Sequence, residues 1–197
     1  FIFLETSPGC AKILKNEFKL NFIENLFNKL NKKNWKINNY ENCKRPYDFL
    51  KLISNNYKIY KILVNYKWDL NEIKSLDYLH NNLKKYSDNI IYFSRRLSIP
   101  DIKKTVFKLG VDKKILNEYF NKKKFYYTNI NLHLSKKISE LDKQIILIDM
   151  NKQICPNIKC DFFDENGQLL FMDESHFSTF GSKFMIPFNK KYLTTNN

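Results

Sequence analysis

The sequence predicts an α/β fold built around a mainly parallel sheet. Three short segments, residues 59–66, 89–94 and 144–149, are apolar and rich in β-branched and aromatic side chains, which is typical of buried strands. Segments of helix length separate them, and apolar strands that alternate with helices indicate a parallel sheet covered on both faces. We therefore expect a three-layer α/β/α sandwich.

Apolar residues recur at helical spacing in each segment that we expect to be a helix. The first spans residues 46–53, where Pro46 suits the first turn and Phe49, Leu50 and Ile53 share one face. Further helices are expected at residues 70–85, at residues 101–109 between Pro100 and Gly110, through Leu116, Tyr119 and Phe120, and at residues 131–141.

The chain changes character after the last predicted strand. Residues 160–172 alternate around Asn166-Gly167, a dipeptide that favours a tight turn between two strands, so a small β-hairpin is expected there. An apolar stretch through Phe180 and Phe184 follows and is expected to form a C-terminal helix. The hairpin thus leads into the polar segment from Asp173 to Ser178.

Length and composition predict one domain with a substantial core. The chain has 197 residues, of which 43% are hydrophobic and 16% aromatic. No apolar run approaches the roughly 18 residues that a membrane span needs, so no transmembrane segment is expected in this chain. Because it begins at Phe1, without Met or a signal peptide, we interpret residues 1–197 as a single domain that lacks its first strand.

The net charge of +14 invites a nucleic-acid interpretation, which the type of basic residue disfavours. Lys accounts for 31 of the 34 basic residues, while Asn numbers 26 and Gly only 4, a bias that an A+T-rich coding sequence would produce. Proteins that grip phosphates favour the bidentate Arg side chain. We expect no nucleic-acid partner. A basic nucleic-acid binder remains an alternative, and it predicts reduced cysteines and a steep dependence of binding on salt.

The four cysteines form two pairs that are local in sequence. They allow three connectivities, and locality favours disulfides between Cys10 and Cys43 and between Cys155 and Cys160. Disulfides would place the chain outside the reducing cytosol. A zinc site of Cys155, Cys160, His176 and Asp173 is the competing interpretation, but the tight ligand pairs of structural zinc sites are missing. No metal or cofactor is therefore expected.

Polar residues near the predicted strand ends and in the C-terminal region are the candidate site residues. Ligands of parallel sheets bind beyond the carboxyl ends of the strands, where Trp68, Ser94-Arg95-Arg96 and Asp149-Met150-Asn151 fall. The sharpest hypothesis concerns Asp173 and His176. A D-x-x-H spacing can set the carboxylate against imidazole Nδ1 and leave Nε2 to take a proton from a serine hydroxyl.

Several other polar residues have plainer interpretations. His80 and His133 lie in helical, Asn- and Lys-rich surroundings and are expected to be surface or partly buried helix residues. A solvated rim is expected for Arg95 and Arg96, with contact to an anionic sugar or phosphate as the alternative.

The segment from Ile145 to Phe184 resembles the C-terminal part of an SGNH domain of the type fused to integral-membrane acyltransferases that O-acylate cell-surface polysaccharides. The resemblance rests on the strand ending in Asp149, Cys155-Pro156, Cys160, and the block Asp173-x-x-His176-x-Ser178-x-x-Gly181. Residues 6–10 are similar to the small-residue-Gly-Cys segment after that family's second strand. Residues 62–68 look like its central strand, which ends in Trp.

The resemblance implies a Ser-His-Asp triad, with His176 and Asp173 as catalytic residues. The family's nucleophile lies in a Gly-Asp-Ser motif, which this sequence lacks, so we expect the serine upstream of Phe1; Ser7 is a weaker candidate. A chain that has lost the serine is the alternative. Asn65 is a candidate oxyanion donor, and Trp68 is a candidate wall of the substrate site.

The implied function is extracytoplasmic transfer of an acyl group, expected to be acetyl, to sugar hydroxyls. A membrane acyltransferase domain or protein would supply the acyl group and tether the chain at the periplasmic face of a bacterial inner membrane. Two alternatives remain open. One is a carbohydrate esterase of the same fold, and the other is a non-catalytic, disulfide-stapled module that binds polyanionic glycans.

Overall fold

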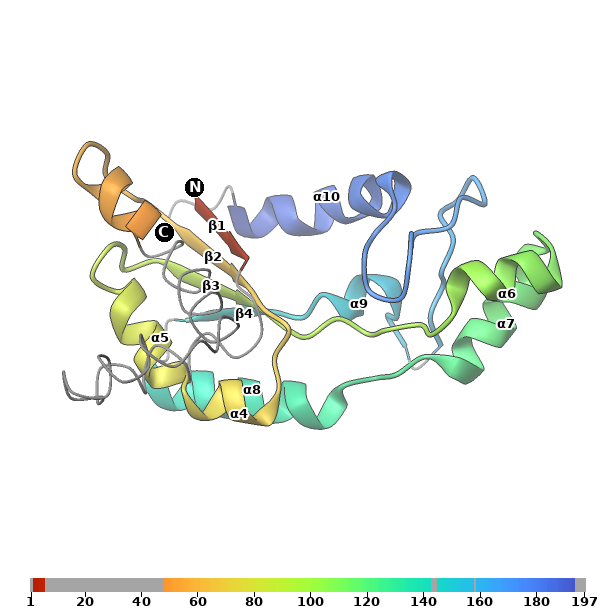
Figure 1. The fold of residues 1–197 in the computed structure, drawn as a ribbon, viewed down its shortest axis with the longest axis horizontal. Coiled ribbons are helices and arrows are strands. Elements are labelled where there is room, and N and C mark those ends of the chain that lie inside the picture. The colour runs from red at the N-terminus through yellow and green to blue at the C-terminus, as the bar shows by residue number, and fades with distance from the viewer. Residues whose placement is uncertain (1, 6–47, 143–144, 158, 194–197) are drawn as a thin grey trace, which may run out of the picture. The chain divides into compact units, whose positions relative to one another are not determined.

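The computed structural model describes residues 2–5, 48–142, 145–157 and 159–193 (Figure 1). The fold class is α/β, as predicted. The chain divides into two compact units, which are described separately below. Unit 1 comprises Phe1–Arg95 and Thr128–Ile148, and unit 2 comprises Arg96–Tyr127 and Asp149–Asn197.

Unit 1 is built on a four-stranded parallel sheet in the order β1-β2-β3-β4. The three predicted strands are present in shorter form, and pairing of residues 2–5 with β2 adds a fourth. Side chains of β2 and β3 are almost all buried, which explains why these strands are apolar apart from Asn65 at the end of β2. The strands are β1 (Ile2–Glu5), β2 (Ile62–Asn65), β3 (Ile90–Phe93) and β4 (Ile146–Ile148).

The helices of unit 1 pack their apolar faces onto this sheet. Residues 48–54 are helical, and they are followed by α4 (Leu70–Lys74), α5 (Leu76–Leu83) and α8 (Thr128–Leu141). In Figure 1, α4, α5 and α8 gather along the same side of the strands, and α8 contacts both α4 and α5. The core includes Leu76, Leu79 and Leu83 of α5 together with Leu134 and Ile138 of α8.

The predicted helix over residues 70–85 is divided in two. Ser75 ends α4 and precedes α5, with its backbone N–H bonded to the carbonyl of Glu72 at 3.0 Å. Asp69 caps the start of α4, because its carboxylate accepts the N–H groups of Asn71 and Glu72. The apolar spacing continues across the break, so hydrophobic periodicity alone does not reveal it.

Unit 2 contains the helices α6 (Ile102–Leu109), α7 (Lys113–Lys123), α9 (Asn151–Ile154) and α10 (Thr179–Leu193). Gly110 ends α6 with a φ of 76°, as its predicted role as terminator requires. The short helix α9 was not predicted. No helix in the described ranges is long and apolar enough to cross a membrane.

The turn predicted at Asn166-Gly167 is confirmed, but an isolated antiparallel bridge between Phe163 and Leu169 takes the place of the two expected strands. Gly167 adopts a φ of 78°, and the Leu170 N–H donates to the carbonyl of Phe162 at 2.9 Å across the turn. Leu170 also accepts the N–H of Ser178 at 2.8 Å, so residues 169–172 have a neighbour on each side. The aromatic core of this region joins Phe120 to Phe162, Phe162 to Phe171, and Phe171 to Phe177.

Candidate functional site

Asp173 and His176 are held together in a short loop of unit 2. An antiparallel bridge between Phe171 and Phe177 closes this loop, and the Met172 N–H donates to the carbonyl of His176 at 2.9 Å. Inside it, Asp173 Oδ1 accepts the backbone N–H groups of Ser175 at 3.0 Å and of His176 at 2.9 Å. The Asp side chain therefore fixes the backbone that presents the imidazole.

The imidazole of His176 is bonded to the same carboxylate. Its Nδ1 lies 2.8 Å from Oδ2 and 2.9 Å from Oδ1 of Asp173. Because an ionised carboxylate only accepts hydrogen bonds, the neutral imidazole carries its proton on Nδ1 and its lone pair on Nε2. Among the described residues Nε2 has no hydrogen-bond partner, and 60% of the side chain is exposed. This nitrogen can thus accept a proton from a reactant.

The carboxyl group of Asp173 is strongly biased towards its charged form. The N–H groups of Ser175 and His176, and then the imidazole, lower the pKa of Asp173 to about 2. Each of these donors bonds the ionised form, and together they outweigh the opposing effect of burial. Asp173 is therefore ionised throughout the range in which enzymes work, as the partner of a basic imidazole must be.

The flanks of this loop are anchored to other parts of unit 2. The carbonyl of Glu174 accepts the N–H of Ile99 at 2.9 Å. On the other side, the guanidinium of Arg96 lies 5.1 Å from the centroid of the Phe177 ring, within cation–π range. Arg96 is thus partly buried and contacts the residue next to His176, rather than lying at a solvated rim.

The residues after His176 explain the rest of the D-x-x-H-x-S-x-x-G spacing. Ser178 Oγ donates to the carbonyl of Leu169 at 2.6 Å and accepts the N–H of Gly181 at 3.1 Å, so it caps the start of α10. A Cβ at Gly181 would overlap the carbonyl group of Leu170. Both residues are needed to pack α10 onto the strand-like segment beside His176.

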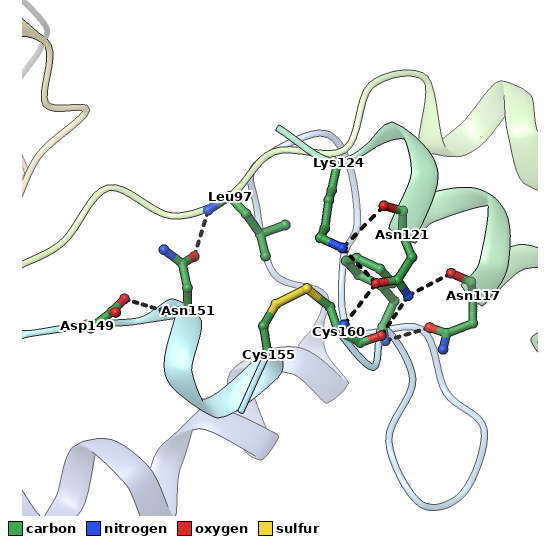
Figure 2. The surroundings of a disulfide bond; sticks show 9 residues. Leu97, Asn117, Asn121, Lys124, Asp149, Asn151, Cys155 and Cys160 are labelled. Carbon is green, nitrogen blue, oxygen red and sulfur yellow. Dashed lines mark hydrogen bonds between the residues drawn. A yellow bond between two sulfur atoms is a disulfide. The ribbon is translucent and has the colours of Figure 1, made fainter. Parts of the chain in front are cut away.

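The predicted disulfide between Cys155 and Cys160 is present (Figure 2). Its formation leaves neither sulfur as a thiolate, so these cysteines are not zinc ligands in this structure. Cys10 and Cys43, predicted to form the other disulfide, lie outside the described residues. So does Ser7, the weaker nucleophile candidate.

Three asparagines support the region around the disulfide (Figure 2), and two of them, Asn117 and Asn121, were missed from sequence. Asn121 of α7 bonds both backbone groups of Cys160 at 2.8 Å, and Asn117, one turn earlier, accepts the N–H of Phe162 at 3.0 Å. Asn151 is 1% exposed and accepts the N–H of Leu97 at 2.7 Å. The i, i+4 spacing of the first two is the signal that could have revealed them.

Two of the candidate site residues near the strand ends of unit 1 bond backbone carbonyl groups of that unit. Trp68 is fully buried, and its indole N–H donates to the carbonyl of Phe93 at 2.7 Å. Arg95 was expected at a solvated rim but is half-buried, and its guanidinium donates to the carbonyl of Trp68 at 2.6 Å. Asn65 is the last residue of β2 and is half-buried.

One further expectation needs correction. His80 was expected to be a surface or partly buried helix residue, yet it is only 3% exposed, and its Nδ1 lies 3.2 Å from the hydroxyl of Tyr92. Burial, with a smaller effect of Lys84, lowers the pKa of His80. It belongs to the core of unit 1.

Comparison with known families gives one finding. The model of the family described as "SGNH domain (fused to AT3 domains)" matches residues 28–190, which include the loop of Asp173 and His176, Ser178, Gly181 and the disulfide. No curated protein and no solved structure gives a significant match to the chain.

Proposed function

The chain belongs to the family of SGNH domains that are fused to AT3 domains, and on that basis we propose that it is an acyltransferase. In this proposal it transfers an acetyl group to sugar hydroxyls of a cell-surface polysaccharide outside the cytoplasm. Membership of the family indicates acyl-transfer or esterase chemistry. The observation that carries the proposal is the bond between Asp173 and His176, which leaves an exposed imidazole nitrogen to act as a base.

In the proposed reaction His176 acts in both steps. Its Nε2 removes the proton from a serine hydroxyl as the serine oxygen attacks the acyl carbonyl, and it then returns that proton to the leaving group. In the second step it takes the proton of a sugar hydroxyl, whose oxygen attacks the acyl-serine ester, and it gives this proton to the serine oxygen as that oxygen leaves. Asp173 holds the imidazole by Nδ1 and stabilises the imidazolium that forms in each step.

We propose that the nucleophilic serine lies in the part of the natural chain that precedes Phe1. The other residues that would complete this domain lie there too. No Gly-Asp-Ser motif occurs in residues 1–197. Asn65 remains our candidate donor to the oxyanion, because it ends a central strand of the parallel sheet. Trp68, which is fully buried, would support the wall of the substrate site behind that strand end.

In this proposal the acyl group reaches this site from a membrane acyltransferase domain or protein. That arrangement implies a tether at the extracytoplasmic face of a bacterial membrane, where the Cys155–Cys160 disulfide would persist. The acceptor in this proposal is a polysaccharide.

The proposal is tested by substituting His176 in the full-length protein in its own cells. With His176→Ala, the acyl content of the isolated surface polysaccharide, measured by proton NMR, should fall to the level of a strain without the protein. The matched control is His133→Ala, a second exposed histidine, which should leave acylation unchanged. Because His176 is mostly exposed, the amount of protein in the membrane should stay the same.

The outcomes also separate the two alternatives. Normal acylation by the His176→Ala protein would overturn the catalytic role and favour a non-catalytic glycan-binding module. Polysaccharide that gains acyl groups when His176 is replaced would indicate a carbohydrate esterase, since the same residues can activate water.

A further inference from the structure

The turn between α6 and α7 exposes large apolar side chains. Every residue from Phe107 to Ile115 is exposed, and we call this segment the hairpin tip. Phe107 is 92% exposed and Val111 is 86% exposed, the two highest values among the large apolar side chains described. Figure 1 shows α6 and α7 as neighbouring helices joined by this short turn, and the two helices are in contact.

The packing of unit 2 does not account for these side chains. The inner faces of the two helices are already supplied by Ile102 and Thr105 of α6 and by Leu116 and Phe120 of α7. Gly110 satisfies the backbone requirement of the turn, so the next position could be polar without strain. Phe107 and Val111 are therefore exposed apolar groups without a structural role within the described chain, as binding surfaces commonly show.

The hairpin tip and the part of α6 that precedes it are strongly basic. Between residues 102 and 115 the sequence has five lysines and one acidic residue, Asp112. The carboxylate of Asp112 accepts the N–H of Ile115 at 2.9 Å, so this acid serves as the cap of α7. The lysines, all exposed, are Lys103, Lys104, Lys108, Lys113 and Lys114.

We propose that the hairpin tip docks on the surface of an anionic lipid bilayer. Phe107 and Val111 would enter the region between headgroups and acyl chains, while the flanking lysines contact lipid phosphates. Apolar side chains between basic ones are the combination that binds such interfaces. A nucleic acid would use the lysines but leave Phe107 and Val111 without a partner. This inference rests in part on the proposed function, since a tether to a membrane acyltransferase domain would place a membrane within reach of the chain.

Both kinds of side chain contribute to the expected affinity. A lysine near an anionic membrane surface strengthens binding by about fivefold. Burial of one large apolar side chain adds about tenfold or more. Binding should consequently require anionic lipid and should weaken when either the apolar side chains or the lysines are replaced. The loss on replacing the apolar side chains distinguishes insertion from simple attraction of a chain with net charge +14.

The test uses the 197-residue chain and vesicles of phosphatidylcholine alone or with 30% phosphatidylglycerol, separated by sedimentation. The chain should bind only the anionic vesicles. Phe107→Ser combined with Val111→Ser should lower the partition coefficient at least tenfold. The matched control replaces two exposed apolar residues of unit 1, Tyr57→Ser and Leu132→Ser, and should bind like the unsubstituted chain. Circular dichroism of each variant checks its fold.

A charge series completes the test. Lys103→Gln, Lys104→Gln and Lys108→Gln together should weaken binding far more than the same change at Lys51, Lys85 and Lys136, which are exposed lysines of unit 1.

Three results would overturn the proposal. The first is an equal loss of binding in the two charge variants, and the second is unchanged binding of the Phe107/Val111 variant. The third is binding only to vesicles that contain the membrane acyltransferase domain, which would identify a protein partner instead. None of these readouts depends on catalysis by His176.

Discussion

His176 Nδ1 lies 2.8 Å from Oδ2 of Asp173, and the same carboxylate accepts the backbone N–H of His176 at 2.9 Å. One side chain thus sets both the backbone of the loop and the orientation of its imidazole. The spacing of three residues makes this double contact possible, because the chain folds back on the carboxylate within a single turn. Loss of the whole side chain should therefore disturb both the loop and the imidazole, whereas loss of its charge alone should disturb only the imidazole.

Asp173→Asn should lower the acylation rate of the full-length protein by about 10³–10⁴-fold. The Asn carbonyl can still accept the N–H groups of Ser175 and His176, so the loop is retained. Its amide can donate to Nδ1, which would put the proton on Nε2 and remove the base. Asp164→Asn is the matched control, since that carboxylate also holds a turn, by accepting the N–H of Gln168 at 2.7 Å. Equal rates for the two variants would contradict the assigned role.

Gly181→Ala should destabilise unit 2 by about 1–3 kcal/mol, because the new methyl group would overlap the carbonyl of Leu170. The measurement is the free energy of unfolding in urea. Ser182→Ala, at the next and exposed position of α10, should change it by less than about 0.5 kcal/mol. If Gly181→Ala were as stable as Ser182→Ala, the close contact of α10 with Leu170 would be wrong.

Removing the Cys155–Cys160 disulfide should cost about 2 kcal/mol, the entropy of closing a short loop. The double variant Cys155→Ala/Cys160→Ala should show this loss in chemical unfolding. Dithiothreitol should lower the free energy of unfolding of the parent chain. It should leave that of the variant unchanged, because the variant has no disulfide at this pair. To separate this pair from the other cysteines, both proteins should also carry Cys10→Ala and Cys43→Ala. A reductant effect of the same size in both would contradict the prediction.

Burial of His80 should make stability depend on pH. Its pKa is lowered from the ordinary 6.5, so the unfolded chain binds a proton more readily than the folded one as the pH falls. The contribution is complete above pH 6.5 and is lost as the pH drops below that value. From pH 7.5 to 5.5, unfolding free energy should fall by up to about 1.4 kcal/mol more than in His80→Gln. His133→Gln, at an exposed site, should retain the full pH dependence.

The fold class was predictable because the strands of unit 1 are buried on both sides. Residues 62–64 and 90–93 are continuous apolar runs for that reason, and Gly110 marked the end of α6. The break at Ser75 was not predictable from periodicity, since α4 and α5 keep the same apolar face in the core. The short helix α9 follows β4 too closely for a hydrophobic pattern to develop.

The candidate site was predictable only where its contacts are local. Asp173 and His176 are three residues apart, and Cys155 and Cys160 are five apart, so spacing alone suggested each pair. Arg96 approaches Phe177 across 81 positions of the sequence, and Asn121 reaches Cys160 across 39. Such partners are set by tertiary packing, which also buried Trp68 and His80.

The most direct test of the central claim, that His176 activates a serine, is the burst of 4-nitrophenolate when the full-length protein reacts with 4-nitrophenyl acetate. The unsubstituted protein and His133→Gln should each release about one equivalent per protein in the first turnover, as the acyl-serine forms. His176→Gln should show no burst. A full burst from His176→Gln, or none from the unsubstituted protein, would contradict the account.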